Sequence, residues 1–161
     1  MPNLSALNAD IFVILFILAK KLSSMTVENK ISDLVLQAAF HVYRALGPGL
    51  VTQAYLECLT YEVRRLGLEV DCRKEMPLVY GDLKIRLGYS IDLMIERRVL
   101  IQVKHGDNFT DLDMAKMQTY LKLSGCKLGF LINFNVRSLK EGIRRVIVDY
   151  KAISEEIKTA I

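Results

Sequence analysis

The strongest constraint on the fold is a change in the spacing of apolar residues at Gly67. Before it, segments 31–47 and 50–67 carry apolar side chains three or four residues apart, which is typical of amphipathic helices. After it come shorter segments that alternate in the manner of β-strands: 69–80, 83–87, 89–95 and 99–104. A chain of this kind is expected to form a sheet with helices packed on it.

The remainder of the chain adds a helix and further strands. Residues 110–124 predict a helix that begins at Thr110, because threonine caps helices well and acidic residues follow in the first turn. Residues 127–134 and 144–150 predict buried strands, and 151–160 predict a short final helix. The order indicates a mixed α/β fold, and 161 residues suffice for about one domain.

Charge and cysteine content exclude some classes of protein. The net charge of +4 tolerates a phosphate-rich partner without demanding one. The three cysteines, Cys58, Cys72 and Cys126, are far apart, and the chain has two histidines. This pattern argues against a zinc cluster and against a disulfide framework, so we expect a reducing, cytoplasmic environment.

Residues 11–19, "IFVILFILA", form an apolar run that Lys20 and Lys21 follow. The run is too short for a membrane span, which needs about 20 residues, and no basic residues precede it as in a signal peptide. We therefore expect residues 1–26 to be an extension, either a packed accessory helix or the result of an early start with Met25 as the natural one. The domain is expected to cover residues 27–161.

Polar residues interrupt two otherwise apolar strands at Asp92, Gln102 and Lys104. The alternation of 89–95 is expected to place Ile91, Leu93 and Ile95 on one face and Asp92 on the other. The strand 99–104 alternates in the same way, with Gln102 and Lys104 on one face.

A turn centred on Arg97 would join these strands as an antiparallel hairpin. This register pairs residue 95 with residue 99 and sets Asp92 opposite Gln102, with their Cβ atoms about 5 Å apart. Lys104 lies two residues further along the same face. A carboxylate, an amide and an ammonium then converge, which suits a metal-binding acid and a lysine with a perturbed pKa. Spacing alone leaves open a sheet face that simply contacts water.

Four stretches in order resemble the GxxExxY family of the PD-(D/E)xK nuclease superfamily: "VYRALGPGL", "YSIDLMIERRVLIQVK", "TYLKLSG" and "KLGFLINFNV". The resemblance covers approximately residues 27–150. It implies a restriction-endonuclease-like αβββαβ core, in which helices flank a mixed central sheet. It also implies Mg²⁺ as the cofactor and nucleic acid as the partner.

Within this resemblance, Asp92 matches the metal-binding aspartate. Lys104 matches the lysine that positions the attacking water and offsets charge on the scissile phosphate. Tyr55 matches the end of the motif that begins at Gly49 and names the family. Tyr120 matches the tyrosine of a Q-xxx-Y signature, and both tyrosines are predicted to contact substrate.

Three positions depart from the family pattern: Thr52 and Gln102 stand where it has glutamate, and Lys116 stands where it has glutamine. Gln102 keeps a carbonyl oxygen, so Asp92 and Gln102 are the predicted metal ligands. Mg²⁺ prefers carboxylates, so we expect weak binding. Lys116 and His105 are predicted to bind substrate, and His105 is predicted to face its phosphate.

Other acids are not expected to replace the missing ligands. Glu57 is about 140° around the helix from Thr52 and is not expected to reach the metal. Asp107, Asp111 and Asp113 follow Lys104 and are predicted to be helix-start acids.

We therefore predict a nuclease-like protein with catalytic residues Asp92, Gln102 and Lys104 and with weak or lost metal-dependent phosphodiesterase activity. Two alternatives stay open. One is an active Mg²⁺-dependent nuclease that uses these three residues. The other is a non-catalytic module that holds a protein partner or a second copy of the chain.

Overall fold

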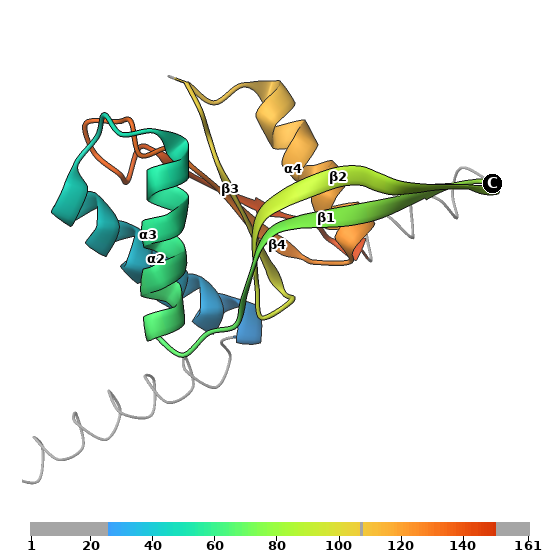
Figure 1. Cartoon of the computed structure of the whole chain (residues 1–161), viewed down its shortest axis with the longest axis horizontal. Coiled ribbons are helices and arrows are strands. Elements are labelled where there is room, and N and C mark those ends of the chain that lie inside the picture. Colours follow the sequence, from blue (N-terminus) through green and yellow to red (C-terminus); the bar gives the residue numbers. More distant parts are fainter. Residues whose placement is uncertain (1–25, 107, 151–161) are drawn as a thin grey trace, which may run out of the picture.

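The computed structural model describes residues 26–106 and 108–150, and Figure 1 shows how their elements are arranged. In chain order these are α2 (Val27–Leu46), α3 (Thr52–Arg65), β1 (Val70–Tyr80), β2 (Leu83–Ile95), β3 (Val99–Val103), α4 (Asp111–Ser124), β4 (Leu128–Ile132) and β5 (Ile143–Ile147). The predicted extension 1–26, apart from Thr26, and the predicted final helix 151–160 lie outside the described residues.

One five-stranded sheet in the order β1-β2-β3-β4-β5 forms the centre of the fold. Neighbouring strands are antiparallel except β3 and β4, which are parallel because α4 connects them. The predicted mixed α/β fold with an αβββαβ order is confirmed. Segments 83–87 and 89–95 were expected as separate strands, which is wrong: they form the single strand β2.

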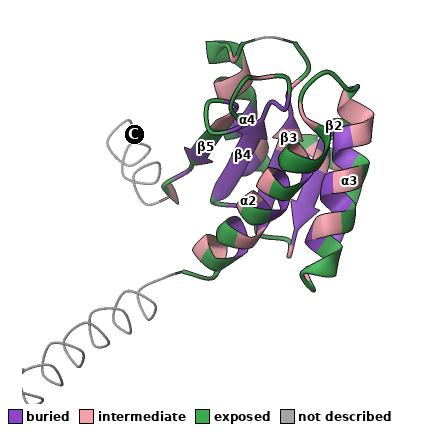
Figure 2. Ribbon diagram, turned by 90° about the vertical axis from the view of Figure 1, so that its left-hand side faces the viewer, coloured by how far each residue is buried: buried purple, intermediate pink, exposed green. Residues whose placement is uncertain are grey.

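Helices cover both faces of the sheet (Figure 2). On one face, α2 and α3 pack on residues such as Leu93, Ile95 and Ile101. On the other face, α4 packs through Met117 and Leu121. Two separate apolar cores therefore hold the sheet, and strands that contribute to both cores are buried on both sides.

The predicted start of α4 is confirmed. Thr110 caps the helix by accepting a hydrogen bond from the Asp113 backbone N–H, and the Asp113 carboxylate accepts one from the Thr110 backbone N–H. This reciprocal arrangement is a capping box, which satisfies two N–H groups that the first helical turn leaves free. It fixes the start of α4 directly after the chain leaves β3.

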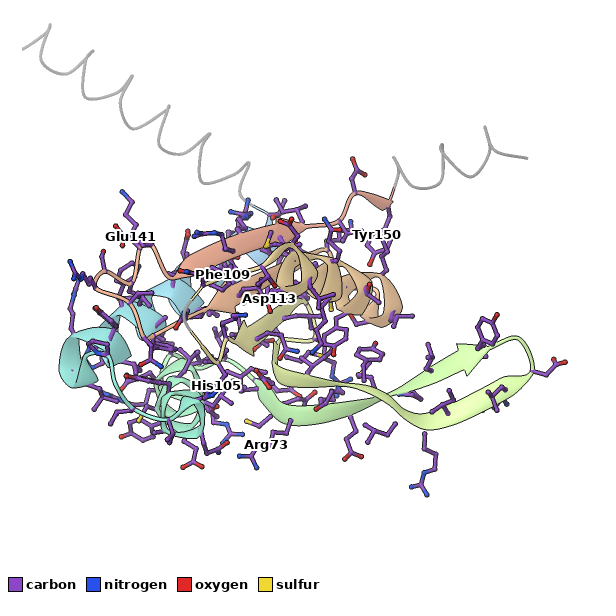
Figure 3. The ribbon with its side chains drawn as sticks, turned by 90° about the horizontal axis from the view of Figure 1, so that it is seen from above. Arg73, His105, Phe109, Asp113, Glu141 and Tyr150 are labelled. Carbon is purple, nitrogen blue, oxygen red and sulfur yellow. The ribbon has the colours of Figure 1, made fainter. Side chains whose placement is uncertain are left out.

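The β1–β2 hairpin projects from the body of the protein, as Figures 1 and 3 show, and we call residues 77–88 the arm. Met76 pairs with Tyr89 but Leu78 pairs with Ile85, so β2 has two more residues than β1 between these pairs. This bulge brings the strands close together: a Cβ atom on Gly88 would lie 2.3 Å from the Leu78 Cβ. Glycine is therefore required at this point of β2.

Within residues 26–106 and 108–150, no helix combines the length and the apolar character that a membrane crossing needs. The apolar run 11–19 lies outside these residues.

Candidate active site

The hairpin of β2 and β3 has the predicted register. Ile95 pairs with Val99, and the last backbone pair is Leu93 with Ile101. Beyond this pair, side chains connect the strands. The Asp92 backbone N–H donates to Gln102 Oε1 at 2.9 Å, and the Val103 backbone N–H donates to Asp92 Oδ2 at 2.8 Å.

Gln102 makes a second bond, from its Nε2 to the Ser90 carbonyl at 3.3 Å. Its amide therefore accepts from one backbone group of β2 and donates to another. The strands separate at this point, and the two polar side chains fill the place of backbone hydrogen bonds. Asp92 and Gln102 thus lie together, as the parity of the two strands predicted.

The expected alternation along β2 is wrong at Ile91. This residue belongs to the core under α4, whereas Leu93 and Ile95 belong to the core under α2 and α3. The change of face coincides with Arg73, which lies across from Asp92 on β1 and has a φ of 46°. The left-handed conformation interrupts the regular pleat. Asp92 therefore lies at the point of β2 where the inward-facing side chains change from one face of the sheet to the other.

Burial raises the pKa of the Asp92 carboxyl group. The Val103 N–H group and the positive charges of Lys116 and Arg73 oppose this increase. Desolvation disfavours the charged form of a carboxyl group, and nearby cations favour it. The fold therefore buries the Asp92 carboxyl group although burial disfavours its charged form, a condition common at functional sites.

A cavity of about 400 Å³ lies between the β2–β3 hairpin and α4. Six of the seven predicted site residues line it: Asp92, Gln102, Lys104, His105, Lys116 and Tyr120. We call this the central cavity. Asp92 lies in β2, Gln102 lies in β3, and Lys104 directly follows β3. The helix α4 supplies Lys116 and Tyr120. The structure thus brings together residues that lie as far apart as 28 positions in sequence.

Lys104 is paired with Asp113, with 2.6 Å between Nζ and Oδ2. The hydrogen bond from Lys104 is the main cause that lowers the pKa of Asp113. Asp113 was predicted only to start the helix, and it has this role and a second one as the partner of Lys104. The signal in the sequence was its place in the first turn of the helix that follows the lysine.

Thr52 connects the site to α3. Its hydroxyl group lies 3.3 Å from His105 Nδ1, in a hydrogen bond. Thr52 is the first residue of α3, so the start of this helix lies beside the end of β3. Figure 3 shows His105 and Asp113 in the body of the protein, away from the tip of the arm.

Tyr120 and Lys116 form the α4 side of the central cavity. The Lys116 Nζ lies 5.9 Å from the centre of the Tyr120 ring, and this ring lies 4.9 Å from that of Tyr89. A cation and an aromatic face are thus both available beside Asp92.

The predicted contact between Tyr55 and substrate requires correction. Tyr55 is 1% exposed and stacks on Phe134, with 4.5 Å between ring centres. Its hydroxyl donates to the Gly47 carbonyl at 2.6 Å and accepts from the Leu50 N–H at 3.1 Å. Tyr55 therefore holds the loop between α2 and α3 and has no surface for a substrate to contact. The signal was available, since Tyr55 precedes Leu59 by four residues on the buried face of α3.

A second cavity of about 610 Å³ lies on the other side of Asp92, between α3 and β1. Glu57 lines this cavity together with Asp92. The Glu57 carboxylate accepts a hydrogen bond from Gln53 Nε2 at 2.6 Å. Glu57 therefore faces the same space as Asp92, although its carboxylate is already bonded on its own helix.

Metal ligands in the site are few. The described part of the chain contains no group of three or more His, Cys, Asp or Glu side chains suited to a metal. Asp92 offers a carboxylate, and Gln102 Oε1 has a second lone pair beyond the one that accepts from Asp92. Such a donor set fits a largely hydrated Mg²⁺ that substrate phosphate helps to hold.

Comparison with known proteins gave one match to a family model. The model described as "PD-(D/E)XK nuclease superfamily" matches residues 29–146. No curated protein matches. A solved structure titled "Crystal structure of SSO0001" aligns with 91% of this chain and 83% of its own, at 16% identity and a TM-score of 0.38.

Proposed function

Because the chain belongs to the PD-(D/E)XK nuclease superfamily, we propose that it binds nucleic acid and hydrolyses phosphodiester bonds slowly with Mg²⁺. We further propose that it is of the GxxExxY type. The observation that carries the proposal is the central cavity, where Asp92, Gln102 and Lys104 lie beside Lys116 and His105. Hydrolysis of a phosphodiester with Mg²⁺ requires oxygen ligands for the metal and cations for the phosphate, and the central cavity offers an acid, an amide oxygen and several cations.

Each residue has a proposed role in this cavity. Asp92 and Gln102 hold Mg²⁺ together with the substrate phosphate, and bound Mg²⁺ supplies Lewis acidity and lowers the pKa of water. Lys104 offsets charge on the scissile phosphate, and Asp113 positions Lys104 through their ion pair. Lys116 attracts the phosphate backbone.

Two features support low activity. The first is the ligand set, because Asp92 is the one carboxylate that the central cavity offers in addition to Asp113, which is bonded to Lys104. The second is the Lys104–Asp113 pair itself. The Asp113 carboxylate, 2.6 Å from Nζ, offsets part of the positive charge that Lys104 would bring to a phosphate, although the three N–H donors of the ammonium allow it to bond both groups.

A cleavage assay tests the proposal. Labelled single- and double-stranded DNA and RNA would be incubated with the protein and Mg²⁺ or Mn²⁺. We expect slow cleavage that Asp92→Ala abolishes and Asp82→Ala leaves unchanged, since Asp82 lies exposed in the turn of the arm. Cleavage that survives Asp92→Ala, or a protein that binds none of these nucleic acids, would overturn the proposal.

The arm favours a second candidate function, a module that binds a protein partner or a second copy of the chain. Val79, Tyr80 and Leu83 are exposed there, and Tyr80 is 79% exposed. A two-stranded ribbon is only marginally stable alone, so an apolar contact would stabilise it. Sedimentation of the wild type and of Tyr80→Ser tests this candidate: association that Tyr80→Ser does not weaken speaks against it.

We propose, finally, a domain of residues 27–161 in the cytoplasm. Support for the first boundary comes from Thr26, whose side chain caps α2 by accepting from the Asn29 N–H. The free thiols of Cys58, Cys72 and Cys126 suit a reducing compartment.

A further inference from the structure

We propose that the cavity between α3 and β1 binds the nucleotide next to the scissile phosphate, with Arg73 on its phosphate and Tyr61 against its base. We call this cavity the flanking pocket. The proposal rests on the proposed function, because it concerns the same substrate. It adds a binding site that shares only Asp92 with the lining of the central cavity.

The size and lining of the flanking pocket suit a nucleotide. Its volume of about 610 Å³ lies within the range of small-ligand sites, about 300–1,000 Å³. Three arginines line it, Arg64, Arg65 and Arg73, against two carboxylates, those of Glu57 and Asp92. The lining thus carries an excess of one positive charge before any metal binds Asp92.

Asp92 connects the two cavities, because its side chain lines both. Arg73 lies on the flanking side and Lys116 on the central side, and the charge of each lowers the pKa of Asp92. A phosphate backbone whose scissile group lies at Asp92 would therefore meet a cation in either direction. One extended strand can cross the site from Lys116 to Arg73.

Arg73 is the arginine that is free to bind a phosphate. Arg64 already donates to the Val70 carbonyl at 3.2 Å, and Arg65 pairs with Glu62 at 3.3 Å. The side chain of Arg73 makes no ion pair or hydrogen bond within residues 26–106 and 108–150. Figure 3 shows Arg73 at the base of the arm.

The backbone of Arg73 supports a functional role. A φ of 46° places this residue in the left-handed region, which costs a non-glycine residue energy and recurs at binding and active sites. Nothing in its side-chain bonding offsets this cost. Contact with a ligand would do so.

Tyr61 supplies a surface for a base. Its side chain lines the flanking pocket and is 62% exposed, and the Arg65 guanidinium lies 5.7 Å from the centre of its ring. Bases stack on aromatic rings without regard to sequence, and arginine strengthens such stacks. The pocket therefore fits any base and favours an unpaired strand.

Binding of a fluorescent single-stranded oligonucleotide to the full-length protein tests the proposal. The best variant is Arg73→Gly, because glycine adopts a positive φ without strain and so removes the charge without harming the fold. It should weaken binding and reduce the slope of log K against log salt by about one. Arg73→Lys should retain the slope, and the matched control Lys84→Ala, on the arm, should leave binding unchanged.

Tyr61→Ala should weaken binding by about 5- to 150-fold, the usual contribution of one stacked base. Tyr80→Ala is its matched control, since Tyr80 is an exposed tyrosine outside both cavities. Cys72 gives an independent readout. It is exposed and lines the flanking pocket, so bound oligonucleotide should slow its alkylation by a maleimide, whereas Cys58, outside the pocket, should react at an unchanged rate.

The outcomes separate this proposal from the proposed function. A wild-type protein that binds no oligonucleotide overturns the proposed function. A wild-type protein that binds and cleaves, while Arg73→Gly and Tyr61→Ala behave like their controls and Cys72 stays unprotected, overturns the flanking pocket alone. Loss of binding in both variants with protection of Cys72 supports it.

Discussion

Replacement of Gln102 by glutamate would test how this site is built. Gln102 accepts from the Asp92 N–H at 2.9 Å and donates to the Ser90 carbonyl at 3.3 Å. An ionised glutamate can only accept. In Gln102→Glu, one carboxylate oxygen keeps the first bond, and the other faces the Ser90 carbonyl oxygen. The new charge also lies across the hairpin from the Asp92 carboxylate.

The magnitude follows from these contacts. The lost hydrogen bond costs about 0.5–1.5 kcal/mol. Two carboxylates about 5 Å apart repel by roughly 3 kcal/mol at an effective dielectric constant of about 20. Lys116 and Arg73 offset part of this repulsion. We expect metal-free Gln102→Glu to lose about 1–4 kcal/mol of its free energy of unfolding.

Thermal unfolding with and without Mg²⁺ or Mn²⁺ measures the loss of stability in Gln102→Glu and the change in its metal binding. A second anionic ligand should tighten metal binding, and a ligand present at about 100 times its Kd stabilises a protein by about 2.7 kcal/mol. The metal should therefore raise the Tm of Gln102→Glu more than that of the wild type. Addition of Asp92→Ala should remove this difference. Gln118→Glu, on the exposed side of α4, is the matched control.

Two results would refute the reasoning. If metal-free Gln102→Glu is as stable as the wild type, then Gln102 does not bond both backbone groups of β2. If the metal raises the Tm of Gln102→Glu no more than that of Gln118→Glu, then Gln102 does not share a metal with Asp92.

Three further predictions concern stability. Asp92→Asn should raise the free energy of unfolding at neutral pH, because the raised pKa of Asp92 makes its charged form costly in the folded state; urea titrations should show the gain shrink as the pH falls toward about 4. Asp113→Ala should lower the free energy of unfolding by about 1 kcal/mol above that pH and by less below it, because the pKa of Asp113 is lowered in the folded state; an equal loss at all pH values would contradict this. Gly88→Ala should lower the Tm by several degrees, since its Cβ would clash with Leu78, whereas Gly81→Ala should affect the turn alone; equal Tm values for Gly88→Ala and the wild type would rule out the close contact.

Local rules were sufficient for much of this fold. The capping of α4 by Thr110 depends on residues three apart, and the pairing of Ile95 with Val99 depends on a short turn. Both can be read from neighbouring residues. The meeting of Asp92 with Gln102 follows from the same register, so the centre of the site was also predictable.

Contacts that depend on distant backbone irregularities were not predictable. The place of Arg73 opposite Asp92 follows from the bulge at Gly88, whose two additional residues leave no clear pattern in the sequence. The change of face at Ile91 coincides with the left-handed backbone of Arg73, which the sequence does not mark either. The pair of Lys104 with Asp113 requires the position of α4 over the sheet, which alternation and spacing do not give.

The bulge in the arm determines which changes in hairpin length the site tolerates. The turn pairs Tyr80 with Leu83, and an uninterrupted ladder from this pair would set Asp71, and not Arg73, opposite Asp92. Matched deletions, one residue from each strand beyond the bulge, would shorten the arm and preserve the strand pairing at its base. Deletion of two residues from β2 alone would place two carboxylates face to face. Unequal insertions and deletions in this exposed hairpin should therefore be selected against as strongly as substitutions in the site itself.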